Sequence, residues 1–162
     1  MLYFAYGSNL NIDQMAARCP CARPVGPFDL VDHELVFRGV ADIVAKPGAR
    51  VAGGLWRITE ECEKALDRYE GVASELYRKE FVTVEVDGCE ERALVYMMNR
   101  TSVFPPSSDY LSTIAEGFRD FGIAIETLKD AVLRSVSGTW VSPRSPRKKT
   151  RPASNSPRTA CT

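Results

Sequence analysis

An apolar run that breaks abruptly into a polar turn, residues 3–10, constrains the fold of this chain more than any other segment. Tyr3 to Tyr6 has the aromatic and apolar composition of a buried strand, and Gly7 interrupts it. A helical pattern follows at once, with Asn11 as a candidate N-cap and Gln14 three residues later. A strand that turns straight into a helix exposes backbone N–H groups, which can bind a carboxylate or a developing oxyanion. The segment alone is equally consistent with an ordinary β–α turn.

Motifs of several common enzyme classes do not occur in this sequence. There is no Gly-x-x-x-x-Gly-Lys-Ser/Thr and no Gly-x-Gly-x-x-Gly, so nucleotide binding has no motif to support it. A serine nucleophile in a Gly-x-Ser-x-Gly elbow is also missing. His33 is the single histidine, and on a predicted strand it is expected to be structural rather than catalytic.

The second informative feature is an acidic residue at the end of a predicted helix. Thr59 is a suitable N-cap, and Glu60 and Glu61 suit the positive first turn of the helix. Gly71 is a typical C′ residue, so Glu70 falls at the carboxyl end, where the helix dipole disfavours a carboxylate. We therefore expect a raised pKa for Glu70, which suits a group that takes and returns a proton near neutral pH. Many surface helices also end in Glu-Gly without any function.

Other acidic residues are alternatives to Glu70. Asp67 lies about one turn earlier on the same predicted helix, where a surface ion pair with Arg68 or Lys64 is the simpler explanation. Asp42 is a charge within an otherwise apolar strand, so it either lines a pocket or is solvated at a strand edge.

Separated motifs along the chain resemble those of the γ-glutamylcyclotransferases. Tyr6-Gly7-Ser8-Asn9-Leu10 is similar to the family's opening signature. Glu70-Gly71-Val72 resembles the surroundings of the family's catalytic carboxylate, and Tyr77 follows it as the family pattern requires. Pro105-Pro106-Ser107-x-x-Tyr110 is similar to the family motif whose tyrosine contacts the substrate. The resemblance extends over roughly residues 1–135 in the same order.

This resemblance implies an enzyme that cyclises the γ-glutamyl group of an amide or peptide to 5-oxoproline and releases an amine or amino acid. The substrate's own α-amine is the nucleophile, so Glu70 alone is expected to act as general acid and base, with no metal and no cofactor. The residues expected to bind the substrate are Tyr3, Phe4, Ala5, Tyr6, Gly7, Ser8, Asn9 and Tyr110.

The middle of the chain is predicted to form strands. Alternating or apolar runs indicate strands at 28–37, 40–45 and 51–58, with Pro47-Gly48 ending the second. Residues 76–86 are expected to pair with 92–98 through an Asp-Gly turn.

Two helices are expected after these strands. The first follows Pro105-Pro106 and includes Tyr110, and the second runs from after Gly122 to about Arg134. Short strands with interspersed helices predict an α+β domain. The resemblance implies a small, closed or partly open, mixed β-barrel flanked by helices.

The composition is that of an ordinary globular protein. At 162 residues, with 44% apolar and 26% charged side chains, one folded domain is expected. No segment has the character of a signal peptide or a membrane span, so a cytoplasmic protein is expected. The five cysteines form an odd set without Cys-x-x-Cys spacing, so reduced thiols are expected rather than a zinc site or a disulfide framework.

The C-terminal segment 137–162 differs from the rest of the chain. The sequence has no net charge, but this segment has six basic and no acidic residues, so it carries +6 and the remainder −6. It is rich in serine and proline and poor in aliphatic side chains. We therefore expect residues 1–136 to form the catalytic domain and 137–162 to be disordered.

Three other functions agree with parts of the sequence. The same fold can bind a γ-glutamyl or related small molecule without turnover, although an intact Glu70 argues against this. The basic tail leaves contact with nucleic acid open, but the acidic body argues against it. The enzyme can also remove a γ-glutamyl protecting group from a biosynthetic intermediate. Glutathione, γ-glutamyl amino acids and γ-glutamyl amines all remain open as substrates, and the chain is expected to be a monomer or a homodimer.

Overall fold

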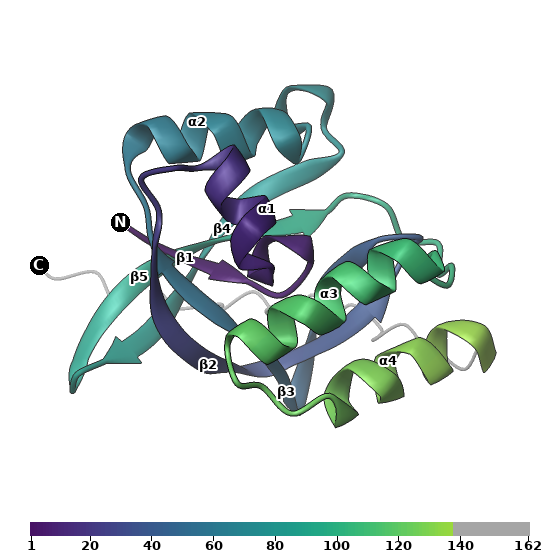
Figure 1. Cartoon of the computed structure of the whole chain (residues 1–162). Helices are drawn as coiled ribbons and strands as arrows, with labels where there is room; N and C mark the ends of the chain where they lie inside the picture. The colour runs from purple at the N-terminus through teal and green to yellow at the C-terminus, as the bar shows by residue number, and fades with distance from the viewer. Residues whose placement is uncertain (138–162) are drawn as a thin grey trace, which may run out of the picture.

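The structure is a computed structural model, and it describes residues 1–137 (Figure 1). Within this part the chain forms a mixed α+β domain of five strands, four α-helices and two short 3-10 helices. The strands are β1 Leu2–Ala5, β2 Arg23–Phe37, β3 Ala41–Arg57, β4 Tyr77–Val86 and β5 Cys89–Met98. The α-helices are α1 Ile12–Arg18, α2 Glu60–Tyr69, α3 Ser108–Asp120 and α4 Glu126–Ser137, and the 3-10 helices are η1 Ser8–Leu10 and η2 Val72–Ser74. Apart from Ser137, the predicted tail lies outside the described residues.

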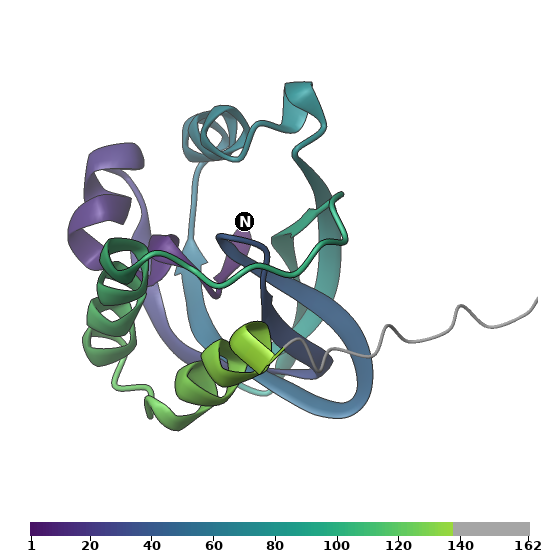
Figure 2. The same ribbon diagram turned by 90° about the vertical axis from the view of Figure 1, so that its right-hand side faces the viewer.

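A single five-stranded sheet in the order β2-β3-β1-β5-β4 organises the domain. The central strand β1 is antiparallel to β3 and parallel to β5, and each of these belongs to an antiparallel hairpin, β2–β3 or β4–β5. The strands bend around a common interior, with the helices on the outside (Figure 2). Because β2 and β4 are the two edges and do not pair, the predicted barrel is partly open rather than closed.

The hairpin β2–β3 corrects one prediction from the sequence. Pro47-Gly48 does not separate two strands, because β3 is continuous through it. In the β2–β3 register, Val31 pairs with Arg50 and His33 with Ala45, so residues 46–49 form a bulge opposite Asp32. Gly48 has a φ of 78°, and its N–H donates to the Asp32 carboxylate at 2.8 Å. The proline and glycine therefore bend a long strand instead of ending it.

The second hairpin agrees with the sequence pattern. Its turn residues Asp87 and Gly88 have φ values of 53° and 77°, as a tight turn with two left-handed positions requires. Helix α3 begins after Pro105-Pro106 with Ser107 as its N-cap, whose hydroxyl accepts a hydrogen bond from the Tyr110 N–H.

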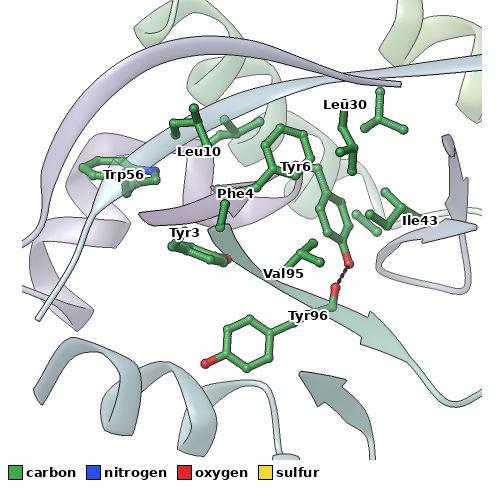
Figure 3. Packing of buried hydrophobic residues seen from close by; sticks show 14 of the residues in the cluster. Tyr3, Phe4, Tyr6, Leu10, Leu30, Ile43, Trp56, Val95 and Tyr96 are labelled. Carbon is green, nitrogen blue, oxygen red and sulfur yellow. Dashed lines mark hydrogen bonds between the residues drawn. The ribbon is translucent and has the colours of Figure 1, made fainter. Parts of the chain in front are cut away.

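The core surrounds strand β1, in which every side chain is buried. The aromatic rings of β1 and β5 meet in this core: Tyr3 and Tyr96 lie edge to face at 5.8 Å between ring centres (Figure 3). Tyr6, just after β1, donates its hydroxyl to the backbone oxygen of Tyr96 at 2.5 Å. The aromatic run at the N-terminus thus forms the centre of the sheet and leads directly into the turn at Gly7.

The tip of the β2–β3 hairpin contains a buried ion pair, and its carboxylate also bonds the end of β5. Asp42 accepts from the Arg38 side chain at 2.7 Å and from the Met98 N–H at 2.8 Å, and both charged side chains are almost fully buried. Burial raises the pKa of Asp42, opposed by these two hydrogen bonds. The bond to Met98 holds the hairpin tip against the end of β5, beside Ala41 in one wall of the pocket described below.

No helix in residues 1–137 is long and apolar enough to cross a membrane.

Candidate active site

The residues predicted from separate parts of the sequence meet at one cavity of about 160 Å³. Seven of the nine predicted site residues line it: Tyr3, Tyr6, Gly7, Ser8, Asn9, Glu70 and Tyr110. The turn after β1 forms one side, the end of α2 another, and Tyr110 reaches in from α3. The spatial convergence that the sequence motifs predict is therefore present in the structure.

Phe4 and Ala5 are not among the lining residues. Phe4 is fully buried in the core, where its ring packs against Phe28. Ala5 is also fully buried and pairs with Gly54 of β3. Alternation along the strand explains the position of Phe4, because its side chain points to the face opposite that of its neighbour Tyr3. Ala5 lies on the same face as Tyr3, but its short side chain is buried in the core.

Glu70 lies at the C-cap of α2, one residue beyond the last helical residue Tyr69. The chain then turns at Gly71, whose φ of 65° requires the left-handed conformation that glycine favours. Burial raises the pKa of the Glu70 carboxyl to about 7, opposed by a hydrogen bond from Asn9 and the charge of Arg18. The expected direction of the shift is confirmed, and desolvation is its main cause. At neutral pH this carboxyl can exist in either protonation state.

Asn9 connects the turn to Glu70. Its amide nitrogen donates to Glu70 Oε1 at 2.9 Å and to the Tyr3 hydroxyl at 2.8 Å. Its amide oxygen accepts from Arg18 at 2.6 Å. The side chain is buried, and the short helix η1 that contains it is followed by α1, which is capped by Asn11 as predicted.

Tyr110 fixes the opposite wall of the cavity. Its hydroxyl accepts a hydrogen bond from the Ala41 N–H at 3.1 Å. The oxygen of Ala41 accepts from the Tyr77 hydroxyl at 3.0 Å, so two phenols hold the same residue. Burial raises the pKa of Tyr110 to about 12, and that of Tyr77 is also raised by burial. Both phenols are therefore neutral hydrogen-bonding groups near neutral pH.

The other acidic candidates have structural partners. Asp42 is neither pocket-lining nor solvated, since it belongs to the buried ion pair with Arg38. Asp67 binds Lys79 at 2.9 Å and accepts from the Tyr96 hydroxyl at 2.7 Å, so its partners are not Arg68 or Lys64. These contacts leave Glu70 as the carboxylate that lines the cavity.

His33 has a local role. Its ring nitrogen lies 2.8 Å from the backbone oxygen of Val31, beside the bulge of β3 and away from the cavity lining.

Several residues of the site could not be identified from the sequence. Tyr69 lines the cavity, and Arg18, which does not, stacks on its ring with the guanidinium carbon 3.8 Å from the ring centre. Tyr69 also lies within hydrogen-bonding distance of Ser8, 3.2 Å between the two hydroxyl oxygens. In the sequence, Arg18 resembles any basic residue in the last turn of a helix, and Tyr69 resembles an ordinary member of an apolar helix face. The one signal in the sequence that could have identified Tyr69 as a site residue is its position directly before Glu70.

A family model described as γ-glutamyl cyclotransferase, AIG2-like, matches residues 3–117. The chain belongs to this family. The matched range extends from the first strand to helix α3, so it includes every residue of the cavity that the motifs predicted.

Two curated γ-glutamylcyclotransferases are similar in sequence to this chain over most of its length. The γ-glutamylcyclotransferase of Bos taurus is 33% identical over 141 residues, which cover 79% of this chain and 75% of the bovine protein. That of Homo sapiens is 32% identical and covers 77% of this chain and 73% of its own length.

Two solved structures agree with this chain in fold. One described as a γ-glutamyl cyclotransferase superposes with a TM-score of 0.73 at 30% identity, covering 81% of this chain and 85% of the other. YkqA from Bacillus subtilis superposes with a TM-score of 0.70 at 26% identity, covering 85% of this chain and 54% of YkqA. The partly open mixed sheet with flanking helices is therefore the fold of this family.

Proposed function

We propose that this protein is a γ-glutamylcyclotransferase that converts a γ-glutamyl amide or peptide into 5-oxoproline and a free amine or amino acid. Family membership and relatives that bear this name support the activity. The observation on which the mechanism rests is Glu70, a carboxyl with a pKa of about 7 in the lining of a cavity that is otherwise rich in phenols.

The reaction removes two protons from the α-nitrogen and gives one to the departing nitrogen. Ionised Glu70 takes the first proton from the substrate's α-ammonium group and passes it to solvent, and the freed amine attacks the γ-carbonyl carbon to form the ring C–N bond. Glu70 then takes the second proton from the ring nitrogen of the tetrahedral intermediate and gives it to the departing nitrogen as the original amide C–N bond breaks. A carboxyl with a pKa near 7 suits both steps, because its two forms are close in energy at neutral pH.

The turn Gly7 to Asn9 is proposed to bind a substrate oxygen through its backbone N–H groups. Either the γ-carbonyl oxygen or the α-carboxylate suits such donors. Tyr110 is proposed to contact the substrate through its hydroxyl, and Tyr3 and Tyr6 to form the pocket floor, with Phe4 and Ala5 acting through their packing. Since the nucleophile belongs to the substrate, the main task of these residues is to hold it folded in the reactive shape.

The wider setting follows from the same proposal. The partner is a small γ-glutamyl molecule, with glutathione, γ-glutamyl amino acids and γ-glutamyl amines as candidates. Residues 1–136 are proposed to be the catalytic domain, working in the cytoplasm as a monomer or homodimer. The thiols of Cys19, Cys21, Cys62 and Cys89 are unpaired, which agrees with a reducing compartment.

The test is to incubate the full-length chain with a panel of γ-glutamyl amides and to measure 5-oxoproline. Glu70→Gln keeps the shape of the side chain but cannot take a proton, so we expect turnover to fall by about 100-fold or more while substrate binding persists. Glu75→Gln is the matched control, because Glu75 is an exposed glutamate five residues away and does not line the cavity.

Two results would contradict the proposal. Near-normal turnover by Glu70→Gln would show that another group is the base. Substrate binding by the wild-type protein without 5-oxoproline formation would instead indicate a binding module.

A further inference from the structure

The orientation of the Asn9 amide is determined by its three partners. Its NH₂ group has two hydrogen atoms, which go to Glu70 Oε1 at 2.9 Å and to the Tyr3 hydroxyl at 2.8 Å. Its oxygen accepts from the Arg18 guanidinium at 2.6 Å. A guanidinium has only donors, so it can face the amide oxygen but not the NH₂ group. A flipped amide would also place its oxygen against the Glu70 carboxylate, so Arg18 and Glu70 favour the same orientation.

Arg18 is itself held from several directions. It donates to the Tyr69 hydroxyl at 2.8 Å and to the side-chain oxygen of Gln14, while its guanidinium stacks on the Tyr69 ring. The Tyr69 hydroxyl in turn lies 3.2 Å from that of Ser8. The guanidinium thus joins α1, the end of α2 and the turn after β1, the three segments on one side of the cavity.

From this geometry we propose that Arg18 is a positioning residue of the active site, which holds the Asn9 amide with its N–H groups toward Glu70 and so determines how readily Glu70 accepts a proton. The proposal rests on the proposed role of Glu70 as acid and base. Arg18 does not line the cavity, so it acts through Asn9 and through its charge rather than by touching the substrate.

The charge environment of Glu70 makes this role measurable. The pKa values of the buried phenols Tyr3, Tyr6, Tyr77 and Tyr110 all respond to the charge of Glu70. Their pKa values are all raised, so they are uncharged in the pH range in which Glu70 titrates. Both the charge of Arg18 and the hydrogen bond from Asn9 lower the pKa of Glu70 against the effect of burial. Loss of Arg18 should therefore raise it.

The experiment compares pH–rate profiles of the full-length protein with Arg18→Met, Arg18→Lys and Tyr69→Phe. In Arg18→Met, we expect the acidic limb of kcat/KM to move up by about one pH unit, with about tenfold lower activity at pH 6. Because Glu70 still ionises at high pH, activity should return to within about threefold of wild type near pH 9.

The other variants grade this effect. Arg18→Lys keeps the charge but not the paired donors, so its acidic limb should lie between those of Arg18→Met and wild type. Tyr69→Phe should shift the limb in the same direction but by less. Arg50→Met is the control, since this side chain is 67% exposed and away from the cavity.

A direct titration of Glu70 separates this inference from the proposed function. When the pH titration of Glu70 is followed by NMR of its carboxyl carbon, the midpoint should lie at a higher pH in Arg18→Met than in wild type. This holds whether or not any tested amide is a substrate. An equal loss of activity at every pH, or an unchanged midpoint, would show that Arg18 has only a structural role or none. Absence of 5-oxoproline formation by the wild type would overturn the proposed reaction, while the NMR midpoint would still decide the role of Arg18. If Arg18→Met does not fold, Arg18→Lys and Tyr69→Phe give the same comparison.

Discussion

The side-chain amide of Asn9 donates a hydrogen bond to the Glu70 carboxylate at 2.9 Å, although 61 residues separate the two in the sequence. Neither residue is unusual within its own segment: one follows a strand in a polar turn, and the other ends a helix. Their contact places a buried carboxyl beside a group that favours its charged form. The balance between burial and this hydrogen bond is what brings the pKa of Glu70 near neutrality.

Glu70 should make the folded protein less stable at alkaline pH. The pKa of Glu70 rises from its ordinary value of 4.5 to about 7 on folding, so the folded state binds this proton more tightly than the unfolded state. The resulting stability is fully present below pH 4.5 and is lost as the pH rises through 7. The loss is on the order of 3 kcal/mol of unfolding free energy. Glu70→Gln cannot titrate and should not show it.

This prediction is checked by urea unfolding of wild type and Glu70→Gln at pH 5 and pH 8. The difference between the two proteins should grow with pH in favour of Glu70→Gln, while other groups contribute equally to both. A stability difference between the two proteins that is the same at pH 5 and pH 8 would show that burial of the carboxylate costs little.

The two phenols that bind Ala41 allow substrate contact to be distinguished from support of the pocket wall. Tyr110→Phe removes the bond to the Ala41 N–H, and Tyr77→Phe removes the bond to its oxygen. Each variant should lose about 1 kcal/mol of unfolding free energy. If Tyr110 also binds the substrate, kcat/KM should fall at least about tenfold further in Tyr110→Phe than in Tyr77→Phe. Equal losses of activity would assign to Tyr110 a supporting role only.

Local features of the fold could be predicted from the sequence because they depend on neighbouring residues. The caps at Asn11, Thr59 and Ser107 and the Asp87-Gly88 turn each need only a short segment, and two of these caps and the turn were predicted. The bulge at Gly48 was not, because a proline and a glycine look the same in a turn and in a bulge.

The site was predictable only in part, and for a similar reason. Family motifs identified Glu70, Tyr110 and the turn, which the structure brings to one cavity. Arg18 and Asp42 owe their roles in part to distant partners, Tyr69 and Met98, which no local pattern could identify. Phe4 and its neighbour Tyr3 point to opposite faces of β1, so Tyr3 lines the cavity while Phe4 is buried in the core. A sequence motif of consecutive residues does not show this difference.

Removing only one partner of the ion pair between Arg38 and Asp42 should strongly destabilise the folded protein. Asp42→Asn leaves the buried Arg38 side chain without this carboxylate and weakens the bond to the Met98 N–H, so we expect a loss of about 3 to 5 kcal/mol. The double variant Arg38→Met with Asp42→Asn should be less destabilised than the sum of the single variants.

Urea unfolding of the two single variants and the double variant measures this coupling. Lys46→Met is the comparison, because its ion pair with Glu34 involves a side chain that is 51% exposed and should contribute less than about 1 kcal/mol. A loss of the same size in Asp42→Asn and Lys46→Met would contradict the assignment of the buried pair as a clamp on the hairpin tip.

Gly117 determines how closely helix α3 approaches the turn that lines the cavity. A Cβ atom at this position would lie 2.5 Å from the Cβ of Leu10 and 2.6 Å from the Asn11 nitrogen, too close for either to remain in place. Gly117→Ala should therefore destabilise the protein by about 1 to 3 kcal/mol despite the better helix propensity of alanine. Because η1 would move together with Asn9, we expect activity to fall more steeply than stability alone explains. The measurement is kcat/KM at a temperature at which the variant remains folded, with Ser112→Ala on the exposed face of α3 as control. Normal activity in folded Gly117→Ala would show that the turn tolerates displacement, and that the close contact between helix and turn is not needed to position Asn9 against Glu70.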